Sequence, residues 1–368
     1  MTGDSRITRR RFLGGVAGGG AAVLGGGRLA EALAAKSAPA VIQGGGKLTY
    51  WGGLIFSDEA NQLLVDTINA WGKENGIETE VVMINQNETN QKVSAAVESG
   101  TMPDALDMGL DLLLLLSNTD QLVPLDDLYD RIGQAHGGWY ESIDASASLF
   151  PGGRTGIPFG SSGNLLFSRR DVLEAKGLTP PPQTWQEVSD WSAQAQDPPL
   201  YGMGFALSNV GDGNLQISVL QSYGGRIADD EGKTVTIKSE ETREYLQWVS
   251  DAYKAGLFPP GVTTWDGAGD NQAYLSGQAI FIANTGSVYL TAKEDDPELE
   301  AATHYAPLPA GPKGRISPIN PNFRAIPKTS RDVEAAKALI EYLANPEFME
   351  AYYNVAIYGP VLKGYEGF

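Results

Sequence analysis

GIPFGSSGNLLFSRRDVLEAKGLTPPPQTWQEV, at residues 156–188, is the stretch that decides the fold class. A glycine- and serine-rich turn leads into an apolar strand and then into a helix that stops at Gly177. After three prolines, Thr184 and Glu187 have the Thr-x-x-Glu spacing of a capping box, which begins a second helix. One face of that helix carries apolar residues that we expect in the core: Trp185, Val188, Trp191 and Ala195. The stretch predicts a turn, a strand and two helices in close succession.

The same alternation of strands and helices continues toward the N-terminus. LTYWGG (48–53), TEVVMI (79–84) and DALDMG (104–109) read as strands. Between the first two, apolar residues recur at helical spacing, with Ser57 or Asp58 as the expected cap, and Asn87 is the expected cap of the next helix. Strand, helix, strand, helix, strand implies a parallel α/β lobe.

Toward the C-terminus the pattern adds further strands and helices. YGMGFAL (201–207) and QAIFIA (278–283) are strand-like. Ser330 is the expected cap of a helix over 336–343, and Asn345 with Pro346 predicts the start of another. The chain has 368 residues, more than the roughly 250 to 300 at which one core stops growing, so we expect two lobes.

Composition excludes several classes of protein. The net charge is −18, which disfavours nucleic acid and anionic membranes as partners. The chain has no cysteine, so disulfides, thiolate metal sites and a lipidated cysteine are excluded. Two histidines rule out a histidine-rich metal site, and we expect no cofactor and no metal. Nothing in the composition calls for an oligomer, and we expect a monomer.

The first 40 residues have the layout of a secretory signal. TRRRFLGG (8–15) precedes a short apolar run diluted by glycines, and cleavage is expected after Ala34 or Ala40. The run is too short and too glycine-rich for a transmembrane helix. Arg9, Arg10, Phe12 and Leu13 resemble the twin-arginine export signal, which implies a translocase partner during export and a periplasmic location.

The order of motifs in the mature chain resembles the extracellular solute-binding proteins of bacterial ABC importers, the family that includes maltose-binding protein. The resemblance rests on six segments: MPDALDMG (102–109), LVPLDDL (122–128), residues 156–178, PPPQTWQEV (180–188), YLSGQAIFIANTG (274–286) and residues 325–347. It implies an α/β fold of two discontinuous lobes with a ligand cleft between them. By this analogy the first lobe holds 46–157 and 285–325, and the second holds 158–284 and 326–368.

Two features depart from the family pattern. Relatives commonly have a tryptophan after the strand that matches QAIFIA, and this chain has Asn284, Thr285, Gly286 and Ser287 there. Stacking of a ligand at that loop is therefore in doubt. The chain also ends at Phe368, where relatives continue through further helices, so a C-terminal truncation is expected.

Candidate ligand contacts lie where the predicted strands end, since parallel sheets bind ligands at their carboxyl ends. Neutral sugars need aromatic rings for stacking and amide, carboxylate or hydroxyl groups for hydrogen bonds. The first-lobe candidates are Trp51, Asn85, Asn87, Asp107 and Asp111, and the resemblance implies a sugar contact for Asp111. Candidates on the expected crossings and in the second lobe are Phe159, Ser162, Asn164, Asp212, Asn284, Ser287, Asn320 and Asn322.

The resemblance implies a non-enzymatic function. The chain is expected to capture a mono- or oligosaccharide by lobe closure and to deliver it to membrane permease subunits. A secreted glycoside hydrolase with two catalytic carboxylates is the main alternative. A binding protein for a polyamine or a polyol is another. Motif order favours binding, and the particular sugar cannot be predicted from these residues.

Overall fold

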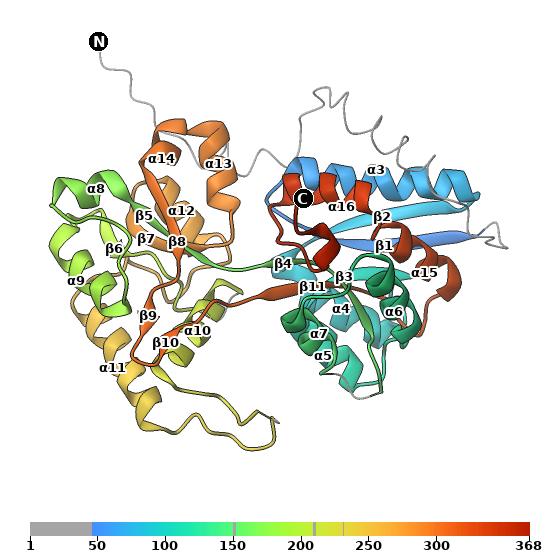
Figure 1. The fold of residues 1–368 in the computed structure, drawn as a ribbon, viewed down its shortest axis with the longest axis horizontal. Coiled ribbons are helices and arrows are strands. Elements are labelled where there is room, and N and C mark those ends of the chain that lie inside the picture. The colour runs from blue at the N-terminus through green and yellow to red at the C-terminus, as the bar shows by residue number, and fades with distance from the viewer. Residues whose placement is uncertain (1–45, 150–151, 209–210, 231) are drawn as a thin grey trace, which may run out of the picture.

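Two α/β lobes lie side by side and are joined by two connecting segments of the described chain (Figure 1). The structure is a computed structural model and describes residues 46–149, 152–208, 211–230 and 232–368. The predicted signal at 1–40, with Arg9, Arg10, Phe12 and Leu13, lies outside the described residues. Within the described ranges, no helix combines the length and the apolarity needed to cross a bilayer.

The first lobe is built on a five-stranded sheet of order β2-β1-β3-β11-β4. Its strands are β1 (Lys47–Leu54), β2 (Glu78–Asn85), β3 (Ala105–Gly109), β4 (Gly156–Ser162) and β11 (Asn320–Ala325). Its helices are α3 (Asp58–Asn75), α4 (Gln86–Ser99), α5 (Leu110–Asn118), α6 (Asp126–Ala135), α7 (Glu141–Ala147), α15 (Val333–Tyr342), α16 (Pro346–Ala356) and η2 (Lys363–Tyr365). β1 pairs in parallel with β2 and β3, as the alternating pattern predicted, and β11 is antiparallel to β3 and β4.

The second lobe is built on a four-stranded sheet of order β6-β7-β5-β8. Its strands are β5 (Leu165–Arg169), β6 (Tyr201–Met203), β7 (Ala279–Asn284) and β8 (Thr303–Pro307), with a short hairpin of β9 (Ala310–Gly311) and β10 (Gly314–Arg315). Its helices are α8 (Arg170–Ala175), α9 (Trp185–Ala195), η1 (Gly211–Asn214), α10 (Leu215–Tyr223), α11 (Glu240–Lys254), α12 (Gly269–Leu275), α13 (Ser287–Asp295) and α14 (Pro297–Ala302). Every residue of β7 is buried, as expected for an apolar strand in the middle of a sheet.

The capping box predicted in the opening stretch is present. Thr184 Oγ1 accepts a hydrogen bond from the Glu187 amide at 3.1 Å, and the Glu187 side chain accepts one from the Thr184 amide at 3.2 Å. Trp185 and Val188 are buried in the second-lobe core, as the helical spacing predicted.

Two predicted caps were wrong by a few residues. Asn85, not Asn87, caps α4, because its side chain reaches the Asn87 amide at 3.0 Å. Asp332, not Ser330, caps α15 through the Ala335 amide at 2.9 Å. Several Asx and Ser residues precede each helix, and the sequence alone does not say which one has the extended backbone that a cap requires.

The chain crosses between the lobes twice. β4 ends at Ser162 in the first lobe and β5 begins at Leu165 in the second, and the chain returns between β10 and β11. The two crossing strands β4 and β11 pair with each other, with Asn320 opposite Ser162. Their register shifts between Asn322 and Phe323, so that one extra residue, Phe159, is inserted in β4.

The lobe boundaries predicted from the resemblance are wrong after residue 284. The buried side chains of the first-lobe core come only from 48–159 and 323–365, and those of the two second-lobe clusters come only from 166–308. Residues 285–319, which carry α13, α14 and β8, therefore belong to the second lobe rather than the first. Residues 326–368 belong to the first lobe rather than the second, because α15 and α16 bury Leu339, Ile340, Phe348 and Tyr352 in its core.

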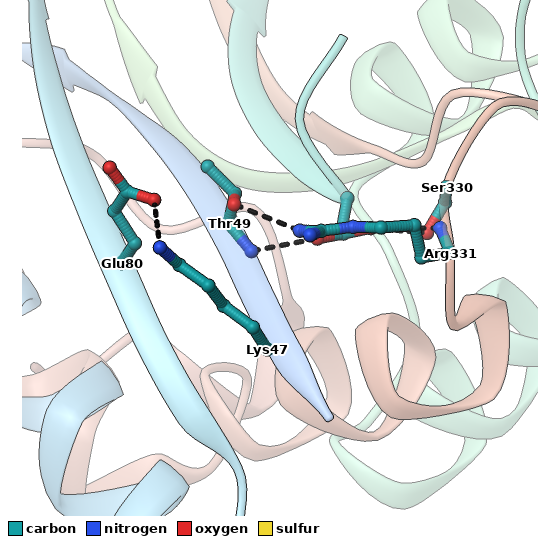
Figure 2. A network of polar contacts seen from close by, with 6 residues as sticks. Lys47, Thr49, Glu80, Ser330 and Arg331 are labelled. Atoms are coloured by element: carbon teal, nitrogen blue, oxygen red, sulfur yellow. Dashed lines mark hydrogen bonds and ion pairs between the residues drawn. The ribbon is translucent and has the colours of Figure 1, made fainter. Parts of the chain in front are cut away.

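A buried carboxylate anchors the start of this C-terminal segment to the first-lobe sheet (Figure 2). Asp104, just before β3, accepts hydrogen bonds from the Arg331 amide at 2.8 Å and from the Arg331 Nε at 3.1 Å. It also accepts one from the Thr49 amide of β1 at 2.7 Å, while Arg331 Nη2 donates to Thr49 Oγ1 at 2.9 Å. Beside them, Lys47 and Glu80 form an ion pair of 2.8 Å. This network joins the segment before α15 to β1 and β3.

Candidate functional site

The carboxyl ends of the first-lobe strands lie at the same edge as the crossings. Asn322 of β11 pairs with Gly109, the last residue of β3, and Asn320 pairs with Ser162 at the end of β4. In the second lobe, Asn284 at the end of β7 is opposite Leu165, where β5 begins. The β3–α5 junction and the loop between β7 and α13 therefore lie beside the two connections between the lobes, where parallel sheets place their ligand sites.

Besides Asn85, Asn87 and Ser287, six predicted contacts have accessible side chains, and five of these six lie near this edge. Asp111 in the first turn of α5 and Asn320 in β11 are exposed, and the others are half-buried. The six residues are Trp51, Asp111, Ser162, Asn164, Asn320 and Asn322. Trp51 lies within β1, opposite Leu106, rather than at the end of the strand as predicted. It packs against the first-lobe core and is only half-buried. Together they offer one aromatic ring, one carboxylate, one hydroxyl and three amides.

Asp107 has a structural partner in the first-lobe core. Only 8% of the residue is exposed, and its Oδ1 lies 3.6 Å from Nε of the fully buried Arg324. The Tyr50 hydroxyl donates to the same carboxylate, and the Gly53 amide donates to Oδ2 at 3.4 Å. Burial raises the pKa of Asp107, and Arg324 opposes this shift. Asp107 thus joins β1, β3 and β11 below the edge.

Phe159, the inserted residue of β4, lies in the same buried cluster. The Arg324 guanidinium carbon sits 4.2 Å from the centre of the Phe159 ring, and Tyr352 and Tyr358 pack at 6.4 Å and 6.2 Å. Phe159 is 5% exposed. The contact of a cation with the face of an aromatic ring fixes the strand at the point where its register shifts.

Asn85 and Asn87 lie at the start of α4. Asn85 caps this helix, and its carbonyl oxygen accepts from Thr89 Oγ1 at 3.2 Å. Asn87 is exposed and is the second residue of the helix. Turn-forming chemistry therefore accounts for Asn85.

Asn284 and Ser287 belong to a buried network in the second lobe. Asn284 Nδ2 donates to Asn271 Oδ1 at 2.7 Å and to Asp270 Oδ2 at 3.1 Å. Its Oδ1 accepts from the Gly286 amide and from Ser287 Oγ, both at 3.0 Å. The network fixes the loop between β7 and α13. Asp212 lies in η1, and its side chain is outside the described part of the structure.

Two apolar side chains near the edge were missed by the sequence analysis. Phe56, which follows β1, is 53% exposed, and Ile319, which precedes β11, is 50% exposed. Exposed large apolar residues beside polar ones are typical of ligand sites. The signal for Phe56 was its place directly after the first predicted strand, within LIFSD (54–58).

A separate open pocket of about 620 Å³ lies in the first lobe between α6 and α7. Its groups pair with one another: Tyr129 stacks on Trp139 at 4.5 Å and donates to Asp144 Oδ1 at 2.8 Å. Arg154 lies over the Tyr129 ring at 4.4 Å and forms an ion pair of 3.0 Å with Asp144. These contacts hold α6, α7 and the segment before β4 together.

No group of three or more carboxylates or histidines suitable for a metal ion is found in the part of the chain that the structure describes. The accessible groups at the edge are able to hydrogen-bond and to stack, and this chemistry suits a neutral, hydroxyl-rich ligand.

The chain is similar to solute-binding proteins of known structure. It has a TM-score of 0.76 and 24% identity to maltose-bound T. maritima MalE3, covering 87% of this chain and 82% of that one. For an ABC transporter solute-binding protein from Thermotoga lettingae bound with α-D-tagatose, the TM-score is 0.75, the identity is 20%, and the coverage is 86% and 81%. At these identities the likeness is one of fold, and it gives the two-lobed periplasmic-binding-protein fold.

Sequence comparison agrees with the fold. A Deinococcus radiodurans protein named "Probable ABC transporter-binding protein" is 24% identical over 215 residues, which are 56% of this chain and 51% of that protein. The chain spans about half the length of the curated relatives it matches. The profile of the family described as bacterial extracellular solute-binding protein matches residues 66–366. Since this match covers most of the sequence and both lobes, the chain belongs to the bacterial extracellular solute-binding proteins.

Proposed function

We propose that the protein is the substrate-binding component of an ABC transporter and captures a mono- or oligosaccharide between its lobes. The observation that carries this proposal is the position of the β3–α5 junction and of the loop between β7 and α13 beside the two crossings. A ligand that touches both of these segments binds better when the lobes are close together, and this difference in affinity shifts the population toward the closed form. The closed form then docks on the permease, and the sugar is released unaltered.

The proposed ligand contacts are the accessible residues of the edge. Trp51 and Phe56 supply apolar faces for sugar rings. Hydroxyl groups are bound by polar side chains from the first lobe and from the connections, namely Asp111, Ser162, Asn164, Asn320 and Asn322. Asp107 and Phe159 support the first-lobe residues from beneath, and Asn284 holds the loop between β7 and α13 in the second lobe.

Sugars are the favoured class because of the chemistry of the edge and because of the ligands of similar proteins. Solved structures with this fold hold maltose, α-D-tagatose and, in an Arthrobacter chlorophenolicus sugar transporter, laminaribiose. The net charge of −18 and the many amides at the edge disfavour an anionic ligand.

We also propose that the protein has no catalytic activity, is exported through the twin-arginine translocase and is free in the periplasm as a monomer. Its partners are the sugar and the permease subunits. Membership of an extracellular solute-binding family supports an extracytoplasmic location, and the arginine-rich leader supports this export route.

A thermal-shift screen tests the proposal, because a ligand that binds only the native state raises the melting temperature. The panel contains maltose, laminaribiose, tagatose, spermidine and glycerol phosphate. We expect a sugar to raise the melting temperature and to be recovered intact. Release of smaller products from a glycan by the pure protein, or a shift with spermidine alone, would contradict the proposal.

A matched pair of variants then tests the site. Asp111→Asn removes an exposed charge in the first turn of α5 and is expected to weaken sugar binding about tenfold, since hydrogen bonds to charged groups contribute roughly 1.5 to 3 kcal/mol. Glu240→Gln removes an exposed charge in the first turn of α11, away from the crossings, and is expected to leave affinity unchanged. Calorimetric titration measures both, and equal affinities for the two variants would remove Asp111 from the site.

A further inference from the structure

Residues from the two lobes meet at a point outside the crossing strands. Gly286 precedes α13 in the second lobe, and Ile357 follows α16 in the first (Figure 1). A methyl group placed on Gly286 would lie 3.3 Å from Ile357 Cγ2 and 3.7 Å from its Cβ. The Ile357 side chain therefore sits directly over the backbone of the second-lobe loop.

The second-lobe side of this contact is rigidly held. Asn284, which is 4% exposed, accepts hydrogen bonds from the amides of Gly286 and Val288 at 3.0 Å and 3.3 Å. Asn271 and Asp270 of α12 hold the Asn284 amide from below and are themselves buried. Because these hydrogen bonds converge on the buried Asn284 side chain, the loop presents Gly286 in a fixed position.

The first-lobe side is clamped to a crossing strand. Ser161 of β4 and Gly359 exchange two backbone hydrogen bonds, of 3.0 Å and 2.8 Å. The ring of Tyr358 fills the space over Gly160, where an added Cβ would lie 2.7 Å from the ring. Any movement of β4 at the crossing is thus passed to the segment that carries Ile357.

The backbone of Ile357 is itself unusual. It ends α16 in the left-handed conformation, with φ 52° and ψ 45°. A β-branched residue is a clear outlier there, and glycine is the residue that most often ends a helix in this way. Such strain persists where the surroundings impose it and is concentrated at sites that switch or bind.

We propose that Ile357 and Gly286 form a contact, the interlobe stop, which sets the angle between the lobes in the ligand-free protein. Ile357 is a positioning residue in this role: it acts on lobe closure and touches no ligand. The proposal deepens the proposed function and rests on its lobe motion. It also gives Asn284 and Ser287 a purpose other than direct contact with sugar, since their network holds Gly286 in place.

Distances between spin labels in the two lobes test the stop directly. The chain has no cysteine, so Lys73→Cys in α3 and Lys254→Cys in α11, both exposed, provide one label site in each lobe. Ile357→Gly removes the side chain and suits the left-handed backbone, and it is expected to broaden and shift the distance distribution without ligand. Ile357→Val keeps a β-branched side chain and is expected to show the same distance distribution as the wild type.

Matched controls separate the contact from backbone strain. Asp120→Gly relieves the positive φ of 58° at an exposed site in the first lobe, and it is expected to leave the distances unchanged. Gly286→Ala adds a methyl group against Ile357 and is expected to shift the distances. Gly277→Ala adds one at a second-lobe glycine with φ 72° but with its nearest neighbour at 3.9 Å, and is not expected to shift them.

The outcomes distinguish the stop from the transport proposal. If Ile357→Gly and Gly286→Ala both leave the ligand-free distances as in wild type, the stop is overturned and Ile357 is merely a strained helix end. If the distances shift as expected but no sugar changes them in wild type, the stop stands and the proposed function fails. If Ile357→Gly does not fold, the test of the interlobe stop rests on Gly286→Ala.

Discussion

A single buried ion pair organises the side chains beneath the candidate site. Arg324 is 1% exposed, lies 3.6 Å from Asp107, donates to the Leu343 carbonyl at 3.0 Å and stacks on Phe159. Removing one member of a buried pair leaves the other charge without compensation. The pair therefore matters to stability mainly through the cost of breaking it.

Arg324→Met is expected to lower the free energy of unfolding by about 3 to 5 kcal/mol. The control is Arg131→Met, which breaks the exposed pair with Glu341 (53% and 44% side-chain exposure) and is expected to cost about 0 to 1 kcal/mol. Urea denaturation measures both. Similar losses of unfolding free energy for the two variants would show that breaking the buried Arg324–Asp107 pair costs no more than breaking an exposed ion pair.

Two buried aspartates respond to pH in opposite directions. Although burial alone raises the pKa of Asp104, hydrogen bonds from Arg331 and Thr49 lower it below its usual value, so its contribution to stability is lost as pH falls. Asp270 has no such cation, and burial raises its pKa to about 6. Its folded pKa is above the unfolded value of 3.8, so its contribution is fully present only below that pH and is lost as pH rises through about 6.

Asp270→Asn provides the test at this scale. The stability of wild type minus that of the variant is expected to rise as pH is lowered from about 7 to 4, by on the order of 3 kcal/mol for a shift of about two pKa units. Chemical denaturation at several pH values measures the difference. A difference that stays flat over this range would mean that Asp270 titrates normally in the folded state.

At the level of elements, the capping box of α9 is the clearest local determinant. Thr184→Ala removes the side-chain acceptor of the Glu187 amide and is expected to cost about 1 kcal/mol. Thr263→Ala, at an exposed turn position, is expected to change stability by less than about 0.5 kcal/mol. Thermal and urea unfolding measure the stability of both variants. Equal stabilities would show that the capping box does not stabilise the protein.

Strands and helices could be predicted from the sequence where the signal for them is local. The strands around Tyr50, Val82 and Phe281 and the helix begun by Thr184 were predicted because alternation, apolar runs and capping residues act over a few positions. The lobe that receives α15 and α16 was not predictable in this way. Leu339 and Phe348 show that each helix buries a face, but not which sheet covers it.

For the candidate site, the polar residues could be identified from the sequence, but the residues that they contact could not. The sequence identified Asp107 and Asn284 as polar residues near strand ends, but their partners Arg324 and Asp270 come from other parts of the chain. Asp111 and Asn322 remain predictions as ligand contacts. Strand order and register place them at the edge, and only the fold supplies that register.

For the whole molecule, two rigid cores joined by two short connections make relative motion of the lobes the natural mode of function. Among the residues that the structure describes, the first-lobe core and the second-lobe clusters share no buried residue, so the lobes can move without disrupting either core. Ligand-driven closure then needs only a difference in affinity between the open and closed forms.

Small-angle scattering with and without a saturating sugar from the thermal-shift screen tests whether the lobes close around the ligand. We expect a smaller radius of gyration with the sugar, and full recovery of the sugar unchanged after removal of the protein. Identical scattering profiles at demonstrated saturation, or a chemically altered sugar, would contradict capture by lobe closure.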